Sequence, residues 1–165
     1  MRILVLSDTH IPVAENDLPT VILEEAKKSD CCFHAGDFIS YDVFRKLASL
    51  TKTYGVCGNI DGRDICEKLP LKQIIPFEGV RLGLIHGRGS PTNLINYICG
   101  EFSGEVSSLA MVVYGHSHFA AEQEIDGTIF FNPGSPTDKI FSPYRSYGIL
   151  EISGMHIQRR IIKIE

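Results

Sequence analysis

Positive charge, paired cysteine motifs and long apolar runs are all scarce in this chain of 165 residues, and each shortage excludes a class of protein. The 16 basic residues are outnumbered by 20 acidic ones, and the net charge of -4 is unlike that of a nucleic-acid-binding protein. The odd number of cysteines and the lack of a CxxC pair make a poor disulfide framework and exclude a thiolate zinc site. The apolar run from Ile3 to Leu6 ends at Ser7, well short of a signal peptide or a membrane span. We therefore expect a cytoplasmic protein without a membrane or nucleic-acid partner.

The length fits one domain that spans residues 1–165 and is sufficient to bury a sizeable core. The chain contains no low-complexity segment, no block of like charge and no convincing internal repeat. Its organisation must therefore be inferred from hydrophobic periodicity.

The first third of the chain alternates between predicted strands and helices. Short apolar runs predict buried strands at 3–6, 31–35 and 54–57. Between them, amphipathic spacing predicts one helix that begins at Asp17 as its N-cap and a second over residues 43–50. This alternation favours a parallel, right-handed βαβ arrangement.

The rest of the chain is richer in strands. Two strands are predicted around Glu78-Gly79, a hairpin around Asp126-Gly127, and a closing pair around Ser153-Gly154. One more strand is predicted at 109–114 and a helix at 93–99. Two sheets packed face to face, with helices outside them, accommodate both parts of the sequence.

Seven polar residues stand just past the predicted strands. In open α/β sheets, side chains at the carboxyl ends of strands gather around a common crevice, so residues more than a hundred positions apart can converge there. Glycines beside them, in the stretches AGD, CGN and YGH, allow the backbone to approach closely. The seven residues are Asp8, His10, Asp37, Asn59, His86, His116 and His118.

Two carboxylates, one carboxamide and four imidazoles would be costly to bury together without cations. Nitrogen and oxygen donors suit manganese, iron, zinc, cobalt or nickel rather than soft copper or thiolate chemistry. Seven ligands are too many for one tetrahedral ion, whereas two ions that share a bridging carboxylate, roughly 3.5–4 Å apart, would use them well. We therefore predict a binuclear metal centre.

The same residues resemble the calcineurin-like metallophosphoesterases, in particular their small bacterial and archaeal phosphodiesterase branch. The resemblance rests on five motifs in family order over nearly the whole chain, and the NPGS stretch at 132–135 is also typical. The five are DTH (8–10), GD (36–37), GNID (58–61), HG (86–87) and GHSH (115–118). Each piece alone is weak, but their order is specific. The resemblance implies an α/β fold, a four-layer αββα sandwich of two mixed sheets flanked by helices.

The resemblance also implies a metal assignment. Asp8, His10, Asp37 and His118 would hold one ion, while Asp37, Asn59, His86 and His116 would hold the other, with Asp37 as the bridge. The cofactors would be two divalent ions, with Mn2+ as the first expectation and Zn2+, Fe2+, Ni2+ or Co2+ as alternatives. A hydroxide formed from water on the metal pair would attack the phosphorus of a small phosphate ester in line, and a phosphodiester is the favoured substrate.

The candidates for catalysis are Asp37, Asn59, Asp61 and Arg63. In larger family members a histidine that is thought to protonate the leaving group follows GN, but Ile60 stands there in this chain and has no proton to give. We therefore expect esters with good leaving groups to be cleaved faster than alkyl esters. Arg63 could bind a nonbridging phosphate oxygen, and Arg88 is a second candidate for that role.

The alternative function is a non-catalytic scaffold, because the fold is similar to that of a eukaryotic retromer subunit whose metal site is impaired. Every ligand position of this chain carries a residue able to bind metal, which favours the enzyme. Similar proteins often form homodimers, although no stripe in this sequence defines a self-complementary face. The physiological substrate and the choice between diester and monoester stay open at this stage.

Overall fold

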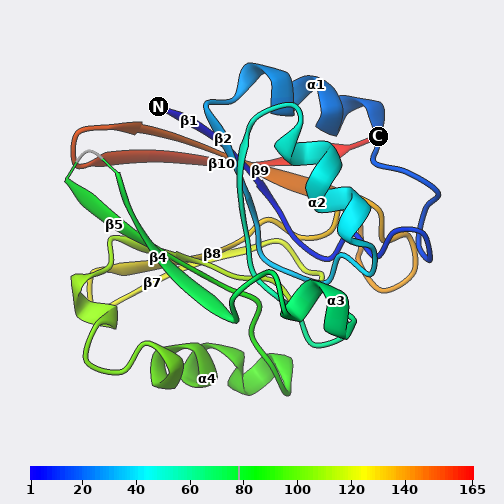
Figure 1. The fold of residues 1–165 in the computed structure, drawn as a ribbon. Helices are drawn as coiled ribbons and strands as arrows, with labels where there is room; N and C mark the ends of the chain where they lie inside the picture. Colours follow the sequence, from blue (N-terminus) through cyan, green and yellow to red (C-terminus); the bar gives the residue numbers. More distant parts are fainter. Residues whose placement is uncertain (78) are drawn as a thin grey trace.

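Two five-stranded sheets organise the chain in the computed structural model, which describes residues 1–77 and 79–165 (Figure 1). The first sheet has the order β10-β9-β1-β2-β3, and the second has the order β4-β5-β6-β8-β7. Strands of the first sheet are β1 (Arg2–Leu6), β2 (Cys31–His34), β3 (Lys52–Gly55), β9 (Arg145–Ser153) and β10 (His156–Ile164). Strands of the second are β4 (Lys72–Phe77), β5 (Val80–Ile85), β6 (Met111–Val113), β7 (Ala121–Ile125) and β8 (Thr128–Asn132).

Both sheets are mixed. In the first, β1, β2 and β3 pair in parallel, whereas β9 runs antiparallel to β1 and to β10. In the second, β5, β6 and β8 are parallel, and β4 and β7 add antiparallel edges. The carboxyl ends of β1, β2 and β3 therefore share one edge of their sheet, and those of β5 and β6 share one edge of theirs.

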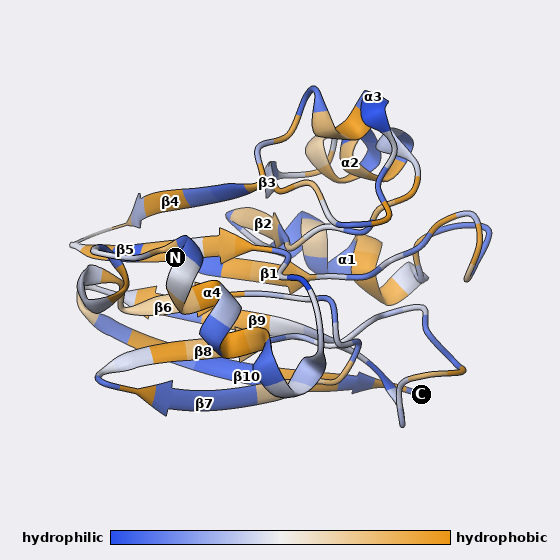
Figure 2. Ribbon diagram, turned by 90° about the horizontal axis from the view of Figure 1, so that it is seen from below, coloured by the Kyte–Doolittle hydropathy of each residue, from blue (hydrophilic) through white to orange (hydrophobic). Residues whose placement is uncertain are grey.

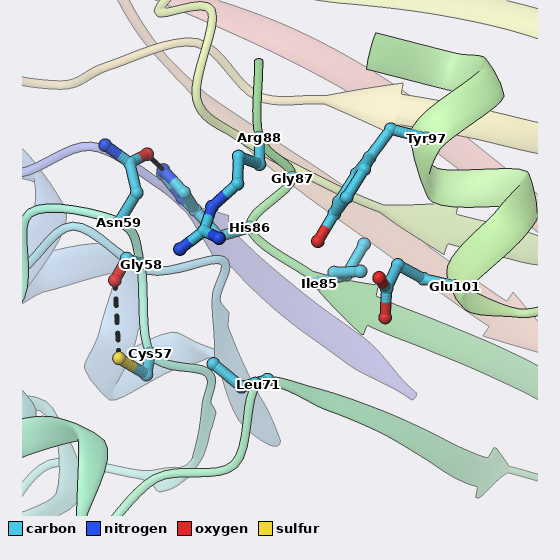
Figure 3. A pocket seen from close by; sticks show the side chains of 10 residues that line it. All are labelled: Cys57, Gly58, Asn59, Leu71, Ile85, His86, Gly87, Arg88, Tyr97 and Glu101. Atoms are coloured by element: carbon cyan, nitrogen blue, oxygen red, sulfur yellow. Dashed lines mark hydrogen bonds between the residues drawn. The ribbon is translucent and has the colours of Figure 1, made fainter.

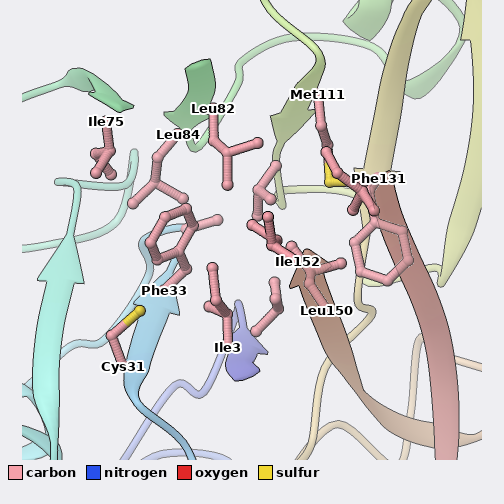
Figure 4. Packing of buried hydrophobic residues seen from close by; sticks show 14 of the residues in the cluster. Ile3, Cys31, Phe33, Ile75, Leu82, Leu84, Met111, Phe131, Leu150 and Ile152 are labelled. Carbon is pink, nitrogen blue, oxygen red and sulfur yellow. The ribbon is translucent and has the colours of Figure 1, made fainter. Parts of the chain in front are cut away.

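The continuous apolar run of β1 is explained by burial on both faces of its sheet. Ile3 and Val5 face the second sheet and pack with Phe33, Leu82 and other side chains of the inter-sheet core (Figure 4). Leu4 and Leu6 point to the other face, against the helices. The edge strands β7 and β10 are more hydrophilic, as their blue colour in Figure 2 shows.

Helices cover the outer faces of both sheets. Helices α1 (Thr20–Lys28) and α2 (Tyr41–Ala48) pack on the first sheet, and α4 (Leu94–Glu101) packs on the second through Leu94 and Ile98 (Figure 1). Two short 3-10 turns, Pro91–Asn93 and Val106–Ser108, flank α4. The prediction of a four-layer αββα sandwich is thus confirmed. No helix in the described part of the chain is long and apolar enough to cross a bilayer.

The predicted hairpins at Asp126-Gly127 and Ser153-Gly154 are present, while some boundaries differ from the prediction. Of the turn predicted at Glu78-Gly79, Glu78 lies outside the described residues. Helix α1 begins at Thr20, after Pro19, and not at Asp17, whose carboxylate instead accepts a hydrogen bond from the backbone N–H of Leu18 at 2.7 Å.

One short helix and one disulfide were not predicted. Helix α3 (Arg63–Cys66) follows the loop after β3 and brings the Cα atom of Cys66 to 5.1 Å from that of Cys57. The two residues form a disulfide, so the expectation that the cysteines offer no disulfide framework is wrong for this pair. Helical signals are weak in a four-residue segment, which is why the proximity could not be anticipated from the sequence.

Candidate metal centre

The loops after five strands carry the seven predicted ligands, and the backbone ties these loops together. After β1 and β2, the N–H of Asp8 donates to the carbonyl of Gly36 at 3.0 Å, and that of His10 donates to the carbonyl of Asp37 at 3.1 Å. After β5 and β6, the N–H of Gly115 donates to the carbonyl of His86 at 3.1 Å. The ligand-bearing loops of each sheet are therefore held in register with one another.

Five of these residues have a left-handed backbone, which L-amino acids other than glycine seldom adopt. Their φ angles are 53° at Asp8, 46° at His10, 60° at Asp37, 73° at His116 and 61° at His118. Such conformations cost on the order of 1–3 kcal/mol each and persist where the surrounding structure enforces them, typically at functional sites. The left-handed turns point the side chains back toward a common centre.

Two glycines permit this close approach. A Cβ atom on Gly58 would lie 2.0 Å from Asp37 Oδ1, and one on Gly115 would lie 2.8 Å from Asp8 Oδ2. Neither backbone segment could occupy its place with a larger residue. The expectation that glycine beside the ligands serves geometry is confirmed at these two positions.

Asp8, His10 and His118 form a first group, in which one candidate ligand atom from each residue lies within 4.8 Å of the others. His118 Nε2 is 3.5 Å from Asp8 Oδ1, and His10 Nε2 is 3.4 Å from Asp37 Oδ2. Within the described part of the chain, His10 Nε2 is buried and makes no hydrogen bond. A buried nitrogen without a partner is costly unless something else occupies the space in front of it.

A second group lies beside the first. His86 Nε2 is 3.2 Å from Asp37 Oδ2 and 3.0 Å from Asn59 Oδ1, and the same Asn59 oxygen is 2.8 Å from His116 Nδ1. Asp37 Oδ2 therefore lies between His10 of one group and His86 of the other. This is the position that a carboxylate shared by two cations would occupy.

The outer nitrogens of three imidazoles define their tautomers. His86 Nδ1 donates to the carbonyl of Ala35 at 2.7 Å, His116 Nε2 donates to that of Gly89 at 2.8 Å, and His118 Nδ1 donates to Asp138 Oδ2 at 2.5 Å. In the neutral rings the inward nitrogens then carry lone pairs. These lone pairs face carboxylate and amide oxygens, so acceptors point at acceptors. Divalent cations between them would satisfy the whole set, and the residues present fit such ions.

The charged groups of the protein also favour a positive charge among these side chains. Burial would lower the pKa of His86, but the carboxylates of Asp37 and Asp8 outweigh it and raise that pKa to about 9. Burial would raise the pKa of Asp37, but the imidazoles of His10 and His86, whose Nε2 atoms lie 3.4 Å and 3.2 Å from its Oδ2, hold that pKa well below its usual range. The carboxylates thus stabilise a cation among them, whether it is a proton or a metal.

Asp138 is a functional candidate that sequence reasoning missed. Its side chain is buried, with the residue only 6% exposed, and Oδ2 accepts the hydrogen bond from His118. Oδ1 accepts hydrogen bonds from the N–H groups of Ile140 at 2.8 Å and Phe141 at 3.0 Å. No motif spacing marks this residue, because the contact with His118 depends on how the loop after β8 folds. A carboxylate behind a ligand histidine is a common feature of metal sites.

Asn132 and Asp61 brace the ligand loops. Asn132 Nδ2 donates to the carbonyl of Gly115 at 2.9 Å, which supports the loop that carries His116 and His118. Asp61 accepts hydrogen bonds from three backbone N–H groups, those of Gly58 at 2.8 Å, Asp37 at 3.0 Å and Ile39 at 2.8 Å. Asp61 therefore joins the loops after β2 and β3.

The two predicted arginines differ in their placement. Arg63 has a side chain that is 92% exposed, and its described ion pair is with Glu67, at 3.6 Å, rather than with any of the seven side chains. Arg88 lines a pocket whose wall includes Asn59 and His86 (Figure 3). The structure thus brings Arg88, and not Arg63, next to the cluster.

Comparison with known proteins agrees with this geometry. A model of the calcineurin-like phosphoesterase superfamily domain matches residues 1–155. A "probable metallophosphoesterase" of Methanothermobacter thermautotrophicus is 32% identical over 167 residues, covering 99% of this chain and 92% of that protein. A phosphodiesterase of Methanocaldococcus jannaschii is 26% identical over 149 residues, covering 81% of this chain and 83% of that protein.

A solved structure that is not named as a phosphoesterase has a similar fold. The crystal structure of Vps29 from Entamoeba histolytica, complexed with zinc, is 20% identical in sequence and has a TM-score of 0.75. The superposition covers 99% of both chains. At this level of identity the similarity establishes a shared fold.

Proposed function

This chain belongs to the calcineurin-like phosphoesterase superfamily, and from that premise we propose that it is a phosphodiesterase that hydrolyses a small phosphate ester with two divalent metal ions. The family acts on phosphate esters and uses divalent metals. We propose further that this protein has a binuclear centre, prefers diesters and takes Mn2+ as its first choice of ion. Residues 1–165 would form one catalytic domain.

The convergence of the seven side chains carries the proposal. Asp8, His10 and His118 would hold one ion and Asn59, His86 and His116 the other, with Asp37 shared between them. Support comes from Asp37 Oδ2, which lies 3.4 Å from His10 Nε2 and 3.2 Å from His86 Nε2. When bound, two such ions supply positive charge for the phosphate oxygens and lower the pKa of a water to provide the nucleophile.

The chain's own residues shape the reaction around that charge. The left-handed turns and the hydrogen bonds to Ala35, Gly89 and Asp138 fix the ligand side chains before substrate arrives, which favours preorganised catalysis. Ile60 reaches the centre only through its backbone N–H, which donates to Asp37 Oδ1 at 3.1 Å. Since its side chain has no proton to give, we expect the leaving group to depart as an anion or to take its proton from water.

Metal removal and replacement test the proposal. The protein stripped with a chelator should be inactive towards bis(4-nitrophenyl) phosphate and should regain activity with Mn2+. Asp37→Asn should lose bound metal and at least about a hundredfold in rate, since metal charge contributes several kcal/mol to such reactions. Asp42→Asn is the matched control, because Asp42 is exposed on α2 and pairs with Arg45.

A non-catalytic scaffold is the second candidate, and the fold shared with Vps29 is the observation that favours it. It would be supported if no metal restored hydrolysis and if Asp37→Asn held as much metal as the parent protein. The filled ligand set favours the enzyme.

Three further expectations accompany the enzyme. We propose the cytoplasm as its compartment because three cysteines, Cys31, Cys32 and Cys99, are unpaired, whereas the Cys57–Cys66 disulfide is the observation that argues against it. A homodimer stays an expectation, which light scattering of the purified protein tests. Negative net charge favours a small ester over a nucleic-acid strand as the substrate.

A further inference from the structure

A groove of about 270 Å³ leads away from the candidate metal centre. It begins at Asn59 and His86, both candidate ligands of one ion, and continues toward α4 and the start of β4 (Figure 3). Its far walls come from Leu71, Ile85 and Tyr97. A phosphate held at the metal centre would therefore have one of its ester substituents at the mouth of this groove.

The walls of the groove combine apolar surface with two charged groups. Leu71 has 72% of its surface exposed although it is a large hydrophobic residue, and the ring of Tyr97 projects into the same space (Figure 3). Apolar surface that is exposed to water is unfavourable, and covering this wall with a ligand would contribute favourable free energy to binding. The size suits one organic substituent and is below the range of roughly 300–1,000 Å³ that is usual for drug-sized ligands.

Arg88 and Glu101 stand at opposite ends of the groove. Arg88 is exposed at the metal end and, among the residues that the structure describes, pairs with no carboxylate. Its planar guanidinium suits a nonbridging phosphate oxygen. Glu101 lies at the far end near Tyr97, where burial and this carboxylate raise the pKa of the tyrosine hydroxyl. A carboxylate at that end accepts hydrogen bonds and favours a ligand with donors there.

From this arrangement we infer that the groove is a subsite for a flat aromatic substituent of the phosphate ester, with the chemistry of a nucleobase. The aromatic group stacks on Tyr97 and covers Leu71, Arg88 contacts the phosphate, and Glu101 accepts hydrogen bonds from amino groups at the distal edge. The inference rests on the proposed function, because it places the phosphate at the metal centre. It adds a substrate class, aromatic over alkyl esters, that the metal ligands alone do not specify.

Binding of two phosphonates, which cannot be hydrolysed, tests the subsite. Phenylphosphonate and methylphosphonate carry the same charged group, and calorimetry with the zinc-loaded protein compares their affinities. We expect phenylphosphonate to bind about tenfold more tightly. In NMR spectra of the same complex, its addition should shift the methyl signals of Leu71 and Ile85, whereas methylphosphonate should leave them in place.

Variants separate the groove from the rest of the site. Tyr97→Leu and Leu71→Gln should each reduce the tenfold preference to about threefold or less. Leu71→Gln lies on an exposed position, so it keeps the test valid if Tyr97→Leu fails to fold. Tyr41→Leu is the matched control, because Tyr41 stacks on Phe44 in α2, away from the groove, and should retain the full preference. Arg88→Met should weaken both phosphonates by a similar factor.

The outcomes distinguish the subsite from the proposed function. Equal affinity for both phosphonates, each dependent on zinc, would overturn the subsite and leave the metal-dependent phosphodiesterase in place. A tenfold preference that Tyr97→Leu and Leu71→Gln both retain would place the phenyl group elsewhere and would also overturn it. If neither phosphonate binds with any ion and no ester is cleaved, the proposed function fails, and the subsite fails with it.

Discussion

If the centre holds two metal ions as proposed, replacement of Asp138 by asparagine should weaken the binding of one ion and leave the binding of the other nearly unchanged. Asparagine keeps the shape of the side chain and one oxygen to accept hydrogen bonds from the N–H groups of Ile140 and Phe141. Its amide nitrogen would then face His118 Nδ1, which is itself a donor. To avoid two opposed donors, the imidazole would have to move its proton to Nε2, the nitrogen that faces Asp8 at 3.5 Å.

The size of the effect follows from the role of such partners. Loss of a hydrogen-bonded carboxylate behind a ligand histidine typically costs 10–100-fold in metal affinity, or about 1.4–2.7 kcal/mol. The loss should fall on the ion held by His118, because Asp138 touches none of the ligands in the second group. Titration of the stripped protein with Zn2+ against a competing chelator should resolve one weakened and one unchanged site.

Two controls separate positioning from general damage. Asp126→Asn changes an exposed aspartate in the β7–β8 turn and should leave both affinities as they are. In a His118→Ala background, Asp138→Asn should have little further effect, because the two residues act as a pair. Metal affinities of a folded Asp138→Asn protein within twofold of the parent at both sites would refute this reasoning.

Three other predictions follow from the same loops. Asp61→Ala leaves three backbone N–H groups without their acceptor and should lower the free energy of unfolding by about 1–3 kcal/mol, which urea denaturation measures; an unchanged midpoint would contradict the bracing role. Gly58→Ala places a methyl group 2.0 Å from Asp37 Oδ1 and should reduce the metal content of the purified protein, so a fully loaded variant would show that the close approach is dispensable. Because Ile60 offers no acid, aryl diesters should be cleaved at least about a hundredfold faster than dialkyl diesters with Mn2+, and similar rates would reveal a proton donor elsewhere.

The strand ends were the most predictable part of the site. Parallel strands place the residues that follow them at one edge of a sheet, so the apolar runs before Asp8, Asp37 and Asn59 were sufficient to predict that these residues gather. The same argument predicted the placement of His86 and His116. This argument depends on where the strands begin and end, which the hydrophobic periodicity of the sequence indicates.

The supporting contacts could not be predicted in the same way. Asp138 meets His118 because an irregular loop after β8 folds back on the centre, and irregular loops have no periodicity to read. The pairing of Cys57 with Cys66 depends on α3, a helix too short to leave a pattern. Arg63 and Arg88 looked equivalent as residues in motif loops, and only the direction of each side chain distinguishes them.

The left-handed backbone of five of the candidate ligand residues affects how such a protein can change over generations. Each of these conformations holds free energy that glycine would release, so mutation to glycine at His10, whose Nε2 makes no hydrogen bond within the described part of the chain, would remove a candidate metal ligand and stabilise the fold. In a lineage that no longer needs hydrolysis, such substitutions could accumulate one position at a time without loss of stability. The fold could thus persist after the activity is lost and serve another function.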